Sequence, residues 1–552
     1  MSRHKLHIFG LIALGVLFRL FLLRYRFAVG WDEPHYLQMA ASFAAGDWAA
    51  FFHPYWSPGL PLWIGLVNLV VPNVELAGRL TTILLGTLIV VPIYLLAREL
   101  AGERVAFWAG LFSAVYPPLA FAQTSPLAEP AYMFFGFLGL WFGWRALQKS
   151  SWFSATAAGL CWGLAYLAKP EGTGFFLVFA AFASARAVAD FINHKRVPSL
   201  LAMVFAGFGF LIAASPYLIY LHEQAGYWTL SAKGTANQQF EATYFTKEKD
   251  DFFESLSPDN KVLPFDAIFH TGTFLQQTKN AEVPGVKISP GLIARKFATN
   301  FFRELKYGLP QTLTLLLIVL FALGLLAKPW QPEEVPLAVF LLSVLVFYWF
   351  VVVPFFHITE RYLMAMLPLA GIWIGRGFLW LADWLKETGK AVLASSISAR
   401  QGMVMALLIF GTFSWLPEIS KVMTQTPHGA GEWAEAVELK EAGEWLREHA
   451  AQQPPIMVSY NKAVDFYAGN YDVRTGVNFS KDSLERQLAY ARYRGARYLV
   501  LSERYAERFP ALQPLLHSVR PDLKLVFTTA NGDVPRALIF EIVPQSYGSV
   551  GN

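Results

Sequence analysis

The sequence predicts a polytopic α-helical membrane bundle followed by a C-terminal soluble α/β domain. Three observations indicate this fold class. Of the 552 residues, 55% are hydrophobic and only 15% are charged, whereas an ordinary globular domain carries about 25% charged residues. From residue 6 to about residue 416 the chain is a series of apolar runs, many close to the roughly 20 residues that cross a bilayer. After Pro417 the composition becomes that of a soluble domain.

Run length places about eleven spans in the first part of the chain. They cover approximately residues 6–23, 78–97, 105–121, 130–147, 153–168, 173–190, 200–220, 309–327, 335–354, 362–382 and 402–417. The apolar segment 59–71 is short and lies between Pro58 and Pro72, so we expect an interfacial or re-entrant helix there instead of a crossing. Arg3 and Lys5 precede the first run without a convincing cleavage site, which favours a retained span over a signal peptide.

Positive charge predicts the orientation, because Lys and Arg concentrate in short cytoplasmic loops. With a cytoplasmic N-terminus every inner loop carries a cation, and these are Arg3, Lys5, Arg98, Arg104, Arg145, Lys149, Lys195, Arg196, Lys328, Lys386, Lys390 and Arg400. Arg24 and Arg26 are exceptions. We therefore expect a multi-pass protein of the bacterial cytoplasmic (inner) membrane, with a transmembrane domain over 1–417 and an extracytoplasmic domain over 418–552. The loops 24–77 and 221–308 also face outward.

The tail alternates predicted helices and strands, which is typical of a small α/β domain. Helical spacing covers 435–448 and 483–494, and strand-like runs cover 455–459, 497–501, 523–527 and 536–542. The tail has no glycine-rich phosphate loop and no metal-spaced Cys/His cluster, so a lid or acceptor-presenting domain is the plainer interpretation. Cys161 is the single cysteine and excludes an intramolecular disulfide.

The first outer loop concentrates ionisable and aromatic side chains. It contains Trp31-Asp32-Glu33-Pro34-His35-Tyr36, then Gly46-Asp47-Trp48, then His53-Pro54-Tyr55-Trp56-Ser57-Pro58-Gly59. Two adjacent carboxylates beside hydrocarbon are costly unless paired or wetted, and their repulsion can keep the pKa of one high enough for a base. Spacing alone leaves a second interpretation open, in which Asp32 caps a helix through Ala45 that has Pro34 in its first turn.

This series resembles the first outer loop of C-type integral-membrane glycosyltransferases. The nearest branch is that of the protein O-mannosyltransferases and lipid A aminoarabinose transferases, which is family 39 and its bacterial relatives. Similar segments follow in the family's order along nearly the whole chain, and these are 76–80, 123–129, 360–363 with Leu367-Pro368, and the tail stretches YNKAVDFYAGN and GARYLVL. Their order and spacing together are specific to the superfamily and not to one substrate.

The resemblance implies a polyprenyl-phosphate sugar as donor, a lipid, glycan or protein hydroxyl as acceptor, and inversion at the anomeric carbon. Asp32 matches the general base, Glu33 would assist it, and Glu129 matches a second acidic catalytic position. A leaving lipid phosphate needs cations. Arg361 is the first choice because its fork grips two oxygens, followed by Lys169 and Arg79, with Arg24 and Arg26 as weaker candidates. Further substrate contacts are expected at Tyr36, His53, Glu171 and Glu360.

Other partners and functions were weighed from the same residues. Where the aminoarabinose branch carries Lys-Pro-Pro, this chain has Ser57-Pro58-Gly59, so Lys169 or an arginine would replace that lysine. His35 and His53 with Glu33 lack tight metal-ligand spacing, so no cofactor is certain and a divalent metal stays open. The net charge of +5 is explained by cations at the membrane edges, so it does not indicate a nucleic-acid partner.

The main alternative function is a transporter or flippase for a lipid-linked or polar solute, but transporters concentrate ionisable groups near the bilayer midplane, often with internal repeats. A non-catalytic assembly scaffold is a third hypothesis.

Overall fold

The computed structural model describes residues 3–194, 198–234, 236, 253–279, 289–327, 329–355, 360–393, 398–426, 435–518, 520–529 and 535–544. The chain forms two compact units. Unit 1 comprises residues 1–25, 79–217 and 289–424, and unit 2 comprises residues 26–78, 218–288 and 425–552. The predicted inner-loop cations Lys195, Arg196 and Lys328 lie outside the described residues.

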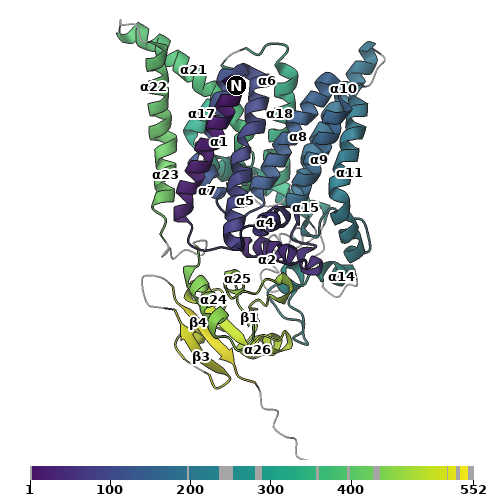
Figure 1. Cartoon of the computed structure of the whole chain (residues 1–552), viewed down its shortest axis with the longest axis vertical. Helices are drawn as coiled ribbons and strands as arrows, with labels where there is room; N and C mark the ends of the chain where they lie inside the picture. The colour runs from purple at the N-terminus through teal and green to yellow at the C-terminus, as the bar shows by residue number, and fades with distance from the viewer. Residues whose placement is uncertain are drawn as a thin grey trace, which may run out of the picture. The chain divides into compact units, whose positions relative to one another are not determined.

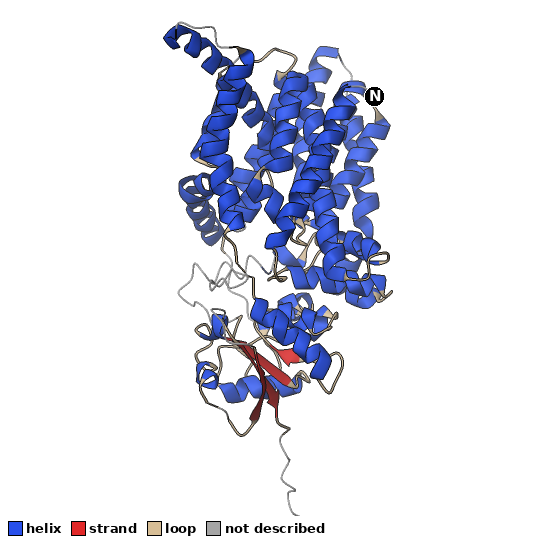
Figure 2. Ribbon diagram, turned by 60° about the vertical axis from the view of Figure 1, so that its left-hand side comes forward, coloured by secondary structure: helices blue, strands red, loops and turns tan. Residues whose placement is uncertain are grey.

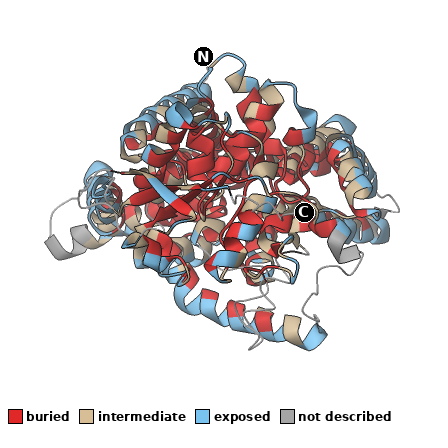
Figure 3. Ribbon diagram, turned by 90° about the horizontal axis from the view of Figure 1, so that it is seen from below, coloured by how far each residue is buried: buried red, intermediate tan, exposed pale blue. Residues whose placement is uncertain are grey.

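Unit 1 is built from long apolar helices (Figure 1). Its principal helices are α1 (Arg3–Leu22), α5 (Val74–Leu88, shared with unit 2), α6 (Val90–Val115), α7 (Pro117–Ala122), α8 (Glu129–Lys149), α9 (Trp152–Ala168), α10 (Thr173–His194), α11 (Pro198–Ala225), α15 (Pro290–Arg303), α16 (Leu309–Thr312), α17 (Leu315–Leu326), α18 (Val335–Phe347), α20 (Glu360–Met364), α21 (Leu367–Leu393), α22 (Ala399–Phe410) and α23 (Leu416–Met423). Single helices carry both buried and exposed residues (Figure 3), as a bundle surrounded by lipid requires.

Glycines set the closest helix contacts of this bundle. A Cβ at Gly324 of α17 would lie 1.8 Å from the carbonyl oxygen of Trp373 in α21, and one at Gly377 would lie 1.9 Å from that of Leu320. Lipid provides no hydrophobic force between helices, so close backbone approach at small residues is what holds such pairs together. The α17–α21 contact therefore depends on both glycines.

Several helices of unit 1 are long enough to cross a membrane. Over the described ranges, six helical segments are long and apolar enough to cross a membrane, or seven if the bent pair 290–312 and 315–326 counts as one span. The segment Val74–Val115 contains two predicted spans, and non-helical Ala101 and Gly102 separate them. Predicted spans 130–147, 153–168 and 362–382 correspond to α8, α9 and α21, which fall outside that set. The predicted short helix at 59–71 is confirmed as α4 (Gly59–Asn68).

Helix continuity differs from the prediction at three places. The span predicted over 309–327 is not one straight helix, because the axis turns by 101° between Thr312 and Leu315. The span predicted over 105–121 is interrupted at Tyr116, since Pro117 and Pro118 carry no backbone N–H with which to continue the helix. The last span does not end at residue 417, because its helix continues through Pro417 to Met423, a proline being tolerated in the first turn.

Unit 2 contains a four-stranded sheet in the order β1-β2-β4-β3 (Figure 2). The strands β1 (Met457–Val458), β2 (Tyr498–Ser502), β3 (Leu523–Thr528) and β4 (Ala537–Ile542) and the helices α24 (Val437–His449) and α26 (Leu484–Tyr493) confirm the six elements predicted in the tail. β1 is parallel to β2, and the other pairs are antiparallel. The unit also holds α2 (Glu33–Ala44), α3 (Trp48–Phe51), α4, α13 (Pro264–Phe269), α14 (Phe274–Lys279), α25 (Ala463–Tyr467) and α27 (Glu503–Ala506).

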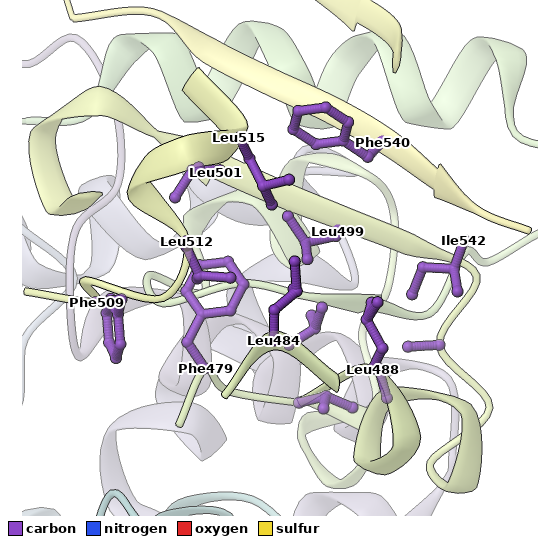
Figure 4. Close-up of a cluster of buried hydrophobic side chains, with 14 of the residues drawn as sticks. Phe479, Leu484, Leu488, Leu499, Leu501, Phe509, Leu512, Leu515, Phe540 and Ile542 are labelled. Atoms are coloured by element: carbon purple, nitrogen blue, oxygen red, sulfur yellow. The ribbon is translucent and has the colours of Figure 1, made fainter. Parts of the chain in front are cut away.

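Strand alternation places helices on both faces of this sheet. Leu499 of β2 and its register partner Phe540 of β4 share a buried cluster with Leu484 and Leu488 of α26 (Figure 4). On the opposite face, the Ser502 hydroxyl donates a hydrogen bond to Glu438 of α24 at 2.8 Å. A mixed sheet between helices is therefore the core of unit 2.

Candidate active site

Asp32 stands at a strained turn that begins α2. The preceding Trp31 has φ of +44°, a region that a bulky side chain rarely adopts, and the rings of Tyr460 and Tyr505 contact its indole at centroid distances of 5.6 and 5.9 Å. Asp32 occupies the N-cap position, yet its side chain makes no capping hydrogen bond. The capping role that the second interpretation gave to Asp32 is therefore not seen. Strain of this kind clusters at functional turns.

The residues around Asp32 are largely engaged in building the first loop. The backbone N–H of Gly30 donates to the buried Glu33 carboxylate at 3.3 Å. Tyr36 is buried with its ring edge-on to Trp56 at 5.6 Å. Glu33 and Tyr36 thus contact other residues of the first loop, and their expected roles toward the substrate stay predictions.

His53 has a defined tautomer. Its Nδ1 accepts hydrogen bonds from the backbone N–H groups of Tyr55 and Trp56 at 3.1 and 3.2 Å. Nε2 must then carry the proton, and it donates to the carbonyl oxygen of His270 at 2.9 Å. With both nitrogens bonded to backbone, His53 fixes the turn 53–59 against α13, which is a different role from the predicted substrate contact.

Three buried rings of unit 2 are held neutral. Burial lowers the pKa of His53 to about 4 and that of His35 to about 3, and burial also holds the pKa of His270 well below its usual value. His35 stacks on Trp56 at 4.4 Å and on His270 at 5.3 Å. Within the described ranges, no group of three or more His, Cys, Asp or Glu side chains is arranged to hold a metal ion, so the histidines with Glu33 form no such group.

Glu129 is the centre of an ion-pair cluster in unit 1. It begins α8, and its Oε1 accepts from the Lys169 ammonium at 3.1 Å and from Arg361 Nε at 2.6 Å. Its Oε2 accepts from Arg361 Nη2 at 3.0 Å. The three residues come from the start of α8, the end of α9 and the short α20. Glu129 was predicted at an acidic catalytic position, and Lys169 and Arg361 were predicted separately as phosphate ligands. The structure shows that these three side chains are hydrogen-bonded to one another.

Aromatic rings surround this cluster. The Lys169 ammonium lies 4.2 Å from the ring centroid of Tyr362 and 6.0 Å from that of Tyr132. Lys169, Tyr132 and Tyr362 also line a cavity of about 30 Å³ together with Glu171 and Tyr348. The Tyr348 hydroxyl donates to the Glu171 carbonyl at 2.7 Å. Among the described residues, the buried Glu171 Oε2 has no hydrogen-bond partner, and Glu171 lines this mainly apolar cavity.

The remaining predicted residues lie elsewhere. Arg79 is buried on α5, and Glu360 is exposed at the first position of α20. Arg24 stacks over Phe21 at 5.8 Å. Arg26 forms an ion pair with Glu435 at 3.0 Å inside unit 2, so its exception to the charge rule has a structural cause.

Sequence reasoning missed Arg19, which lies inside the first predicted span. It is fully buried and bonded to Gln123, the residue at which α7 ends. A charged residue within an apolar run is itself a signal of a specific role. The paired prolines at 117 and 118 were a second signal, because they leave carbonyl groups without partners.

The predicted resemblance to the polytopic C-type glycosyltransferases is confirmed at the level of fold, as the comparisons with known proteins show. A family model described as dolichyl-phosphate-mannose-protein mannosyltransferase matches residues 53–220. That stretch contains Glu129 and Lys169. No curated protein matches the sequence significantly.

Solved structures share the fold over most of the chain. ArnT from Cupriavidus metallidurans bound to undecaprenyl phosphate is 14% identical, with a TM-score of 0.54 and 98% of both chains covered. The Archaeoglobus fulgidus oligosaccharyltransferase in complex with Zn and sulfate is 13% identical, with a TM-score of 0.53 over 97% of this chain and 74% of that one. AglB from Archaeoglobus fulgidus, in complex with an inhibitory peptide and a dolichol-phosphate, is 12% identical, with a TM-score of 0.51 over 92% and 70%.

Proposed function

We propose that this chain is a glycosyltransferase that moves a sugar from a polyprenyl-phosphate donor to a hydroxyl of a lipid, glycan or protein. The reaction takes place at the outer face of the bacterial cytoplasmic membrane, with the N-terminus in the cytoplasm. The fold shared with ArnT and AglB, whose structures hold undecaprenyl phosphate and dolichol-phosphate, supports this class of donor. The observation that carries the proposal is the Glu129–Lys169–Arg361 cluster.

The chemistry is a single displacement with inversion. The acceptor oxygen attacks the anomeric carbon, the bond from that carbon to the phosphate oxygen breaks, and the acceptor proton passes to the Asp32 carboxylate. Asp32 suits this role because its side chain is not used as a helix cap and because the strained Trp31 turn fixes the backbone beside it. Glu33 supports the same turn through Gly30.

The charge of the cluster matches the charge that develops on the leaving group. The donor is a phosphodiester with one negative charge, and the released phosphomonoester gains a second as the bond breaks. Arg361 and Lys169 supply two positive charges and Glu129 one negative charge, so the three groups sum to +1. Preorganised charge of this sign stabilises a developing anion without reorganisation.

Glu129 acts in this scheme as a positioning residue. Both of its oxygens accept from the cations, so it orients Lys169 and Arg361 toward the phosphate and does not itself take a proton. Glu171 is the better candidate for binding a sugar hydroxyl, because the residue lines the cavity beside Lys169 and one of its carboxylate oxygens has no partner among the described residues.

Two aspartates of the same loop allow a matched test. Asp32→Asn removes the base and keeps the shape, whereas Asp47→Asn changes a carboxylate that caps α3 by accepting from the N–H of Ala50 at 3.0 Å. Transfer from a panel of synthetic polyprenyl-phosphate hexoses and pentoses is measured in proteoliposomes. Asp32→Asn should abolish transfer, and Asp47→Asn should retain it with little change in stability, because asparagine caps a helix about as well as aspartate.

Two outcomes would reject the proposal. Undiminished transfer by Asp32→Asn would show that Asp32 is not the general base. A product that retains the donor's anomeric configuration, measured by NMR, would exclude a single displacement. Translocation of a labelled polyprenyl-phosphate sugar across the vesicle membrane without any transfer would instead support the flippase.

A further inference from the structure

Arg19 is a fully buried cation of the first helix that has only neutral partners. Its exposed fraction is 0%. Nε donates to Gln123 Oε1 at 3.0 Å, Nη1 donates to the carbonyl oxygens of Gly15 and Ala114 at 3.0 and 2.8 Å, and Nη2 donates to Ser113 O at 3.2 Å and to Gln123 Oε1. A guanidinium has five N–H donors, and these five bonds use each of them. Arg19 therefore has no donor left for a ligand.

The acceptors explain why a guanidinium stands there. In a continuous helix, the carbonyls of Ser113 and Ala114 would accept from the N–H groups of residues 117 and 118. Both of those residues are proline and have no N–H. Hydrocarbon offers no water to replace the missing donors, and Arg19 supplies them from α1. Trp415 completes the repair, because its indole N–H donates to the next carbonyl, that of Val115, at 2.8 Å.

Gln123 links this repair to the ion-pair cluster. It is the C-cap residue that follows α7, and a compact connection of five residues leads from it to Glu129. Within that connection the hydroxyl of Thr124 donates to Phe121 O at 2.7 Å, and the N–H of Leu127 donates to Ser125 O at 2.7 Å. Thr124, Ser125 and Ala128 are buried. A displacement of Gln123 is therefore transmitted to the start of α8, where Glu129 orients its two cations.

Space around Gln123 is restricted as well. A Cβ at Gly86 of α5 would lie 2.8 Å from three side-chain atoms of Gln123. That is closer than real Cβ contacts, so the glycine allows the amide to reach Arg19.

We propose that Arg19, through Gln123, is a positioning residue for the phosphate-binding cluster. This inference rests on the proposed function, because it concerns the same Glu129, Lys169 and Arg361. Arg19 contacts no substrate. It fixes the end of α6 and the connection 123–129, and hence the distance from Glu129 to the cations that receive the lipid phosphate.

The test measures the affinity of the purified full chain, in lipid nanodiscs, for undecaprenyl phosphate, together with its thermal stability. Arg19→Lys keeps the charge but cannot bridge the carbonyls and Gln123 at once. It should weaken carrier binding by about threefold to tenfold, and Gly86→Ala, which displaces Gln123 without touching the charge, should act in the same direction. Arg376→Lys is the control, since Arg376 also donates to a helix-end carbonyl, that of Gly324 at 3.2 Å, and should leave the affinity unchanged.

A double-mutant cycle separates positioning from general support. If Arg19 acts through the cluster, Arg19→Lys has no further effect on affinity once Arg361→Ala has removed the main phosphate contact. Unchanged affinity in Arg19→Lys and Gly86→Ala, or a fully additive effect in the double variant, overturns the inference while leaving the proposed function intact. If Arg361→Ala itself binds the carrier normally, the phosphate assignment fails, and the inference fails with it.

Discussion

Replacing Glu129 by glutamine tests the ion-pair cluster most directly. The substitution keeps the shape of the side chain and removes the negative charge that Lys169 and Arg361 share. Three charge-assisted hydrogen bonds are affected, and the Lys169 and Glu129 side chains are only 7% and 9% exposed. Lys169 would stay buried against Tyr362 without its carboxylate partner, and a buried charge that loses its partner is costly.

The magnitude follows from these contacts. Bonds to charged groups contribute about 1.5–3 kcal/mol each, the glutamine oxygen still accepts one of them, and the Arg361 side chain is 30% exposed, so solvent screens its share. We expect a net loss of about 2–4 kcal/mol in the free energy of unfolding. Denaturant unfolding of the purified protein in detergent, followed by tryptophan fluorescence, measures this loss.

The matched control is Glu99→Gln. Glu99 pairs with Arg145 at 3.9 Å, and both side chains are partly exposed, so the expected change is within about 1 kcal/mol. Equal stability losses at the two positions, or none at Glu129, would refute the reasoning that a buried three-residue cluster forms.

Two further predictions concern unit 2 and the orientation of the chain. The pKa values of His53 and His35 are lowered to about 4 and about 3 by burial, so the unfolded chain binds protons first as the pH falls below about 6.5. The stability of unit 2 should therefore be full above that pH and decline toward pH 4, and thermal unfolding at pH 7.5 and pH 4.5 that showed no difference would contradict the buried neutral rings. A cysteine placed at the exposed Lys524 should react with an impermeant maleimide from outside intact cells, because the native Cys161 is buried and adds little background. Lys149→Cys, in a predicted inner loop, should react only after permeabilisation, and the reverse pattern would invert the proposed orientation.

Local patterns in the sequence predicted the elements of the tail well. Short apolar runs over 497–501 and 536–542 predicted β2 and β4, since a strand buried on both faces is a short apolar run. Helical spacing of apolar residues predicted α24 and α26, because each helix buries only one of its faces. The short length of the run between Pro58 and Pro72 identified α4.

Contacts between residues that are far apart in the sequence could not be predicted from these local patterns. Glu129, Lys169 and Arg361 were each singled out, but their mutual hydrogen bonds arise from the packing of helices that are far apart in sequence. The bend between Thr312 and Leu315 was missed because the span was placed from the length of the apolar run, which carries no information on the direction of the helix axis. The loops 26–78 and 218–288 were predicted as loops of the membrane domain, whereas tertiary contacts place them in one compact unit with the C-terminal residues.

The interruption between α6 and α7 makes position 19 depend on positions 117 and 118, which are far from it in the sequence. A relative that replaced Pro117 and Pro118 with ordinary residues would recover two backbone bonds and leave two of the five donors of the position-19 guanidinium without acceptors. A relative that lost only the arginine would leave two bare carbonyls in lipid. Each intermediate is worse than either complete state, so substitutions at 19, 117 and 118 should appear together or not at all among descendants of this chain.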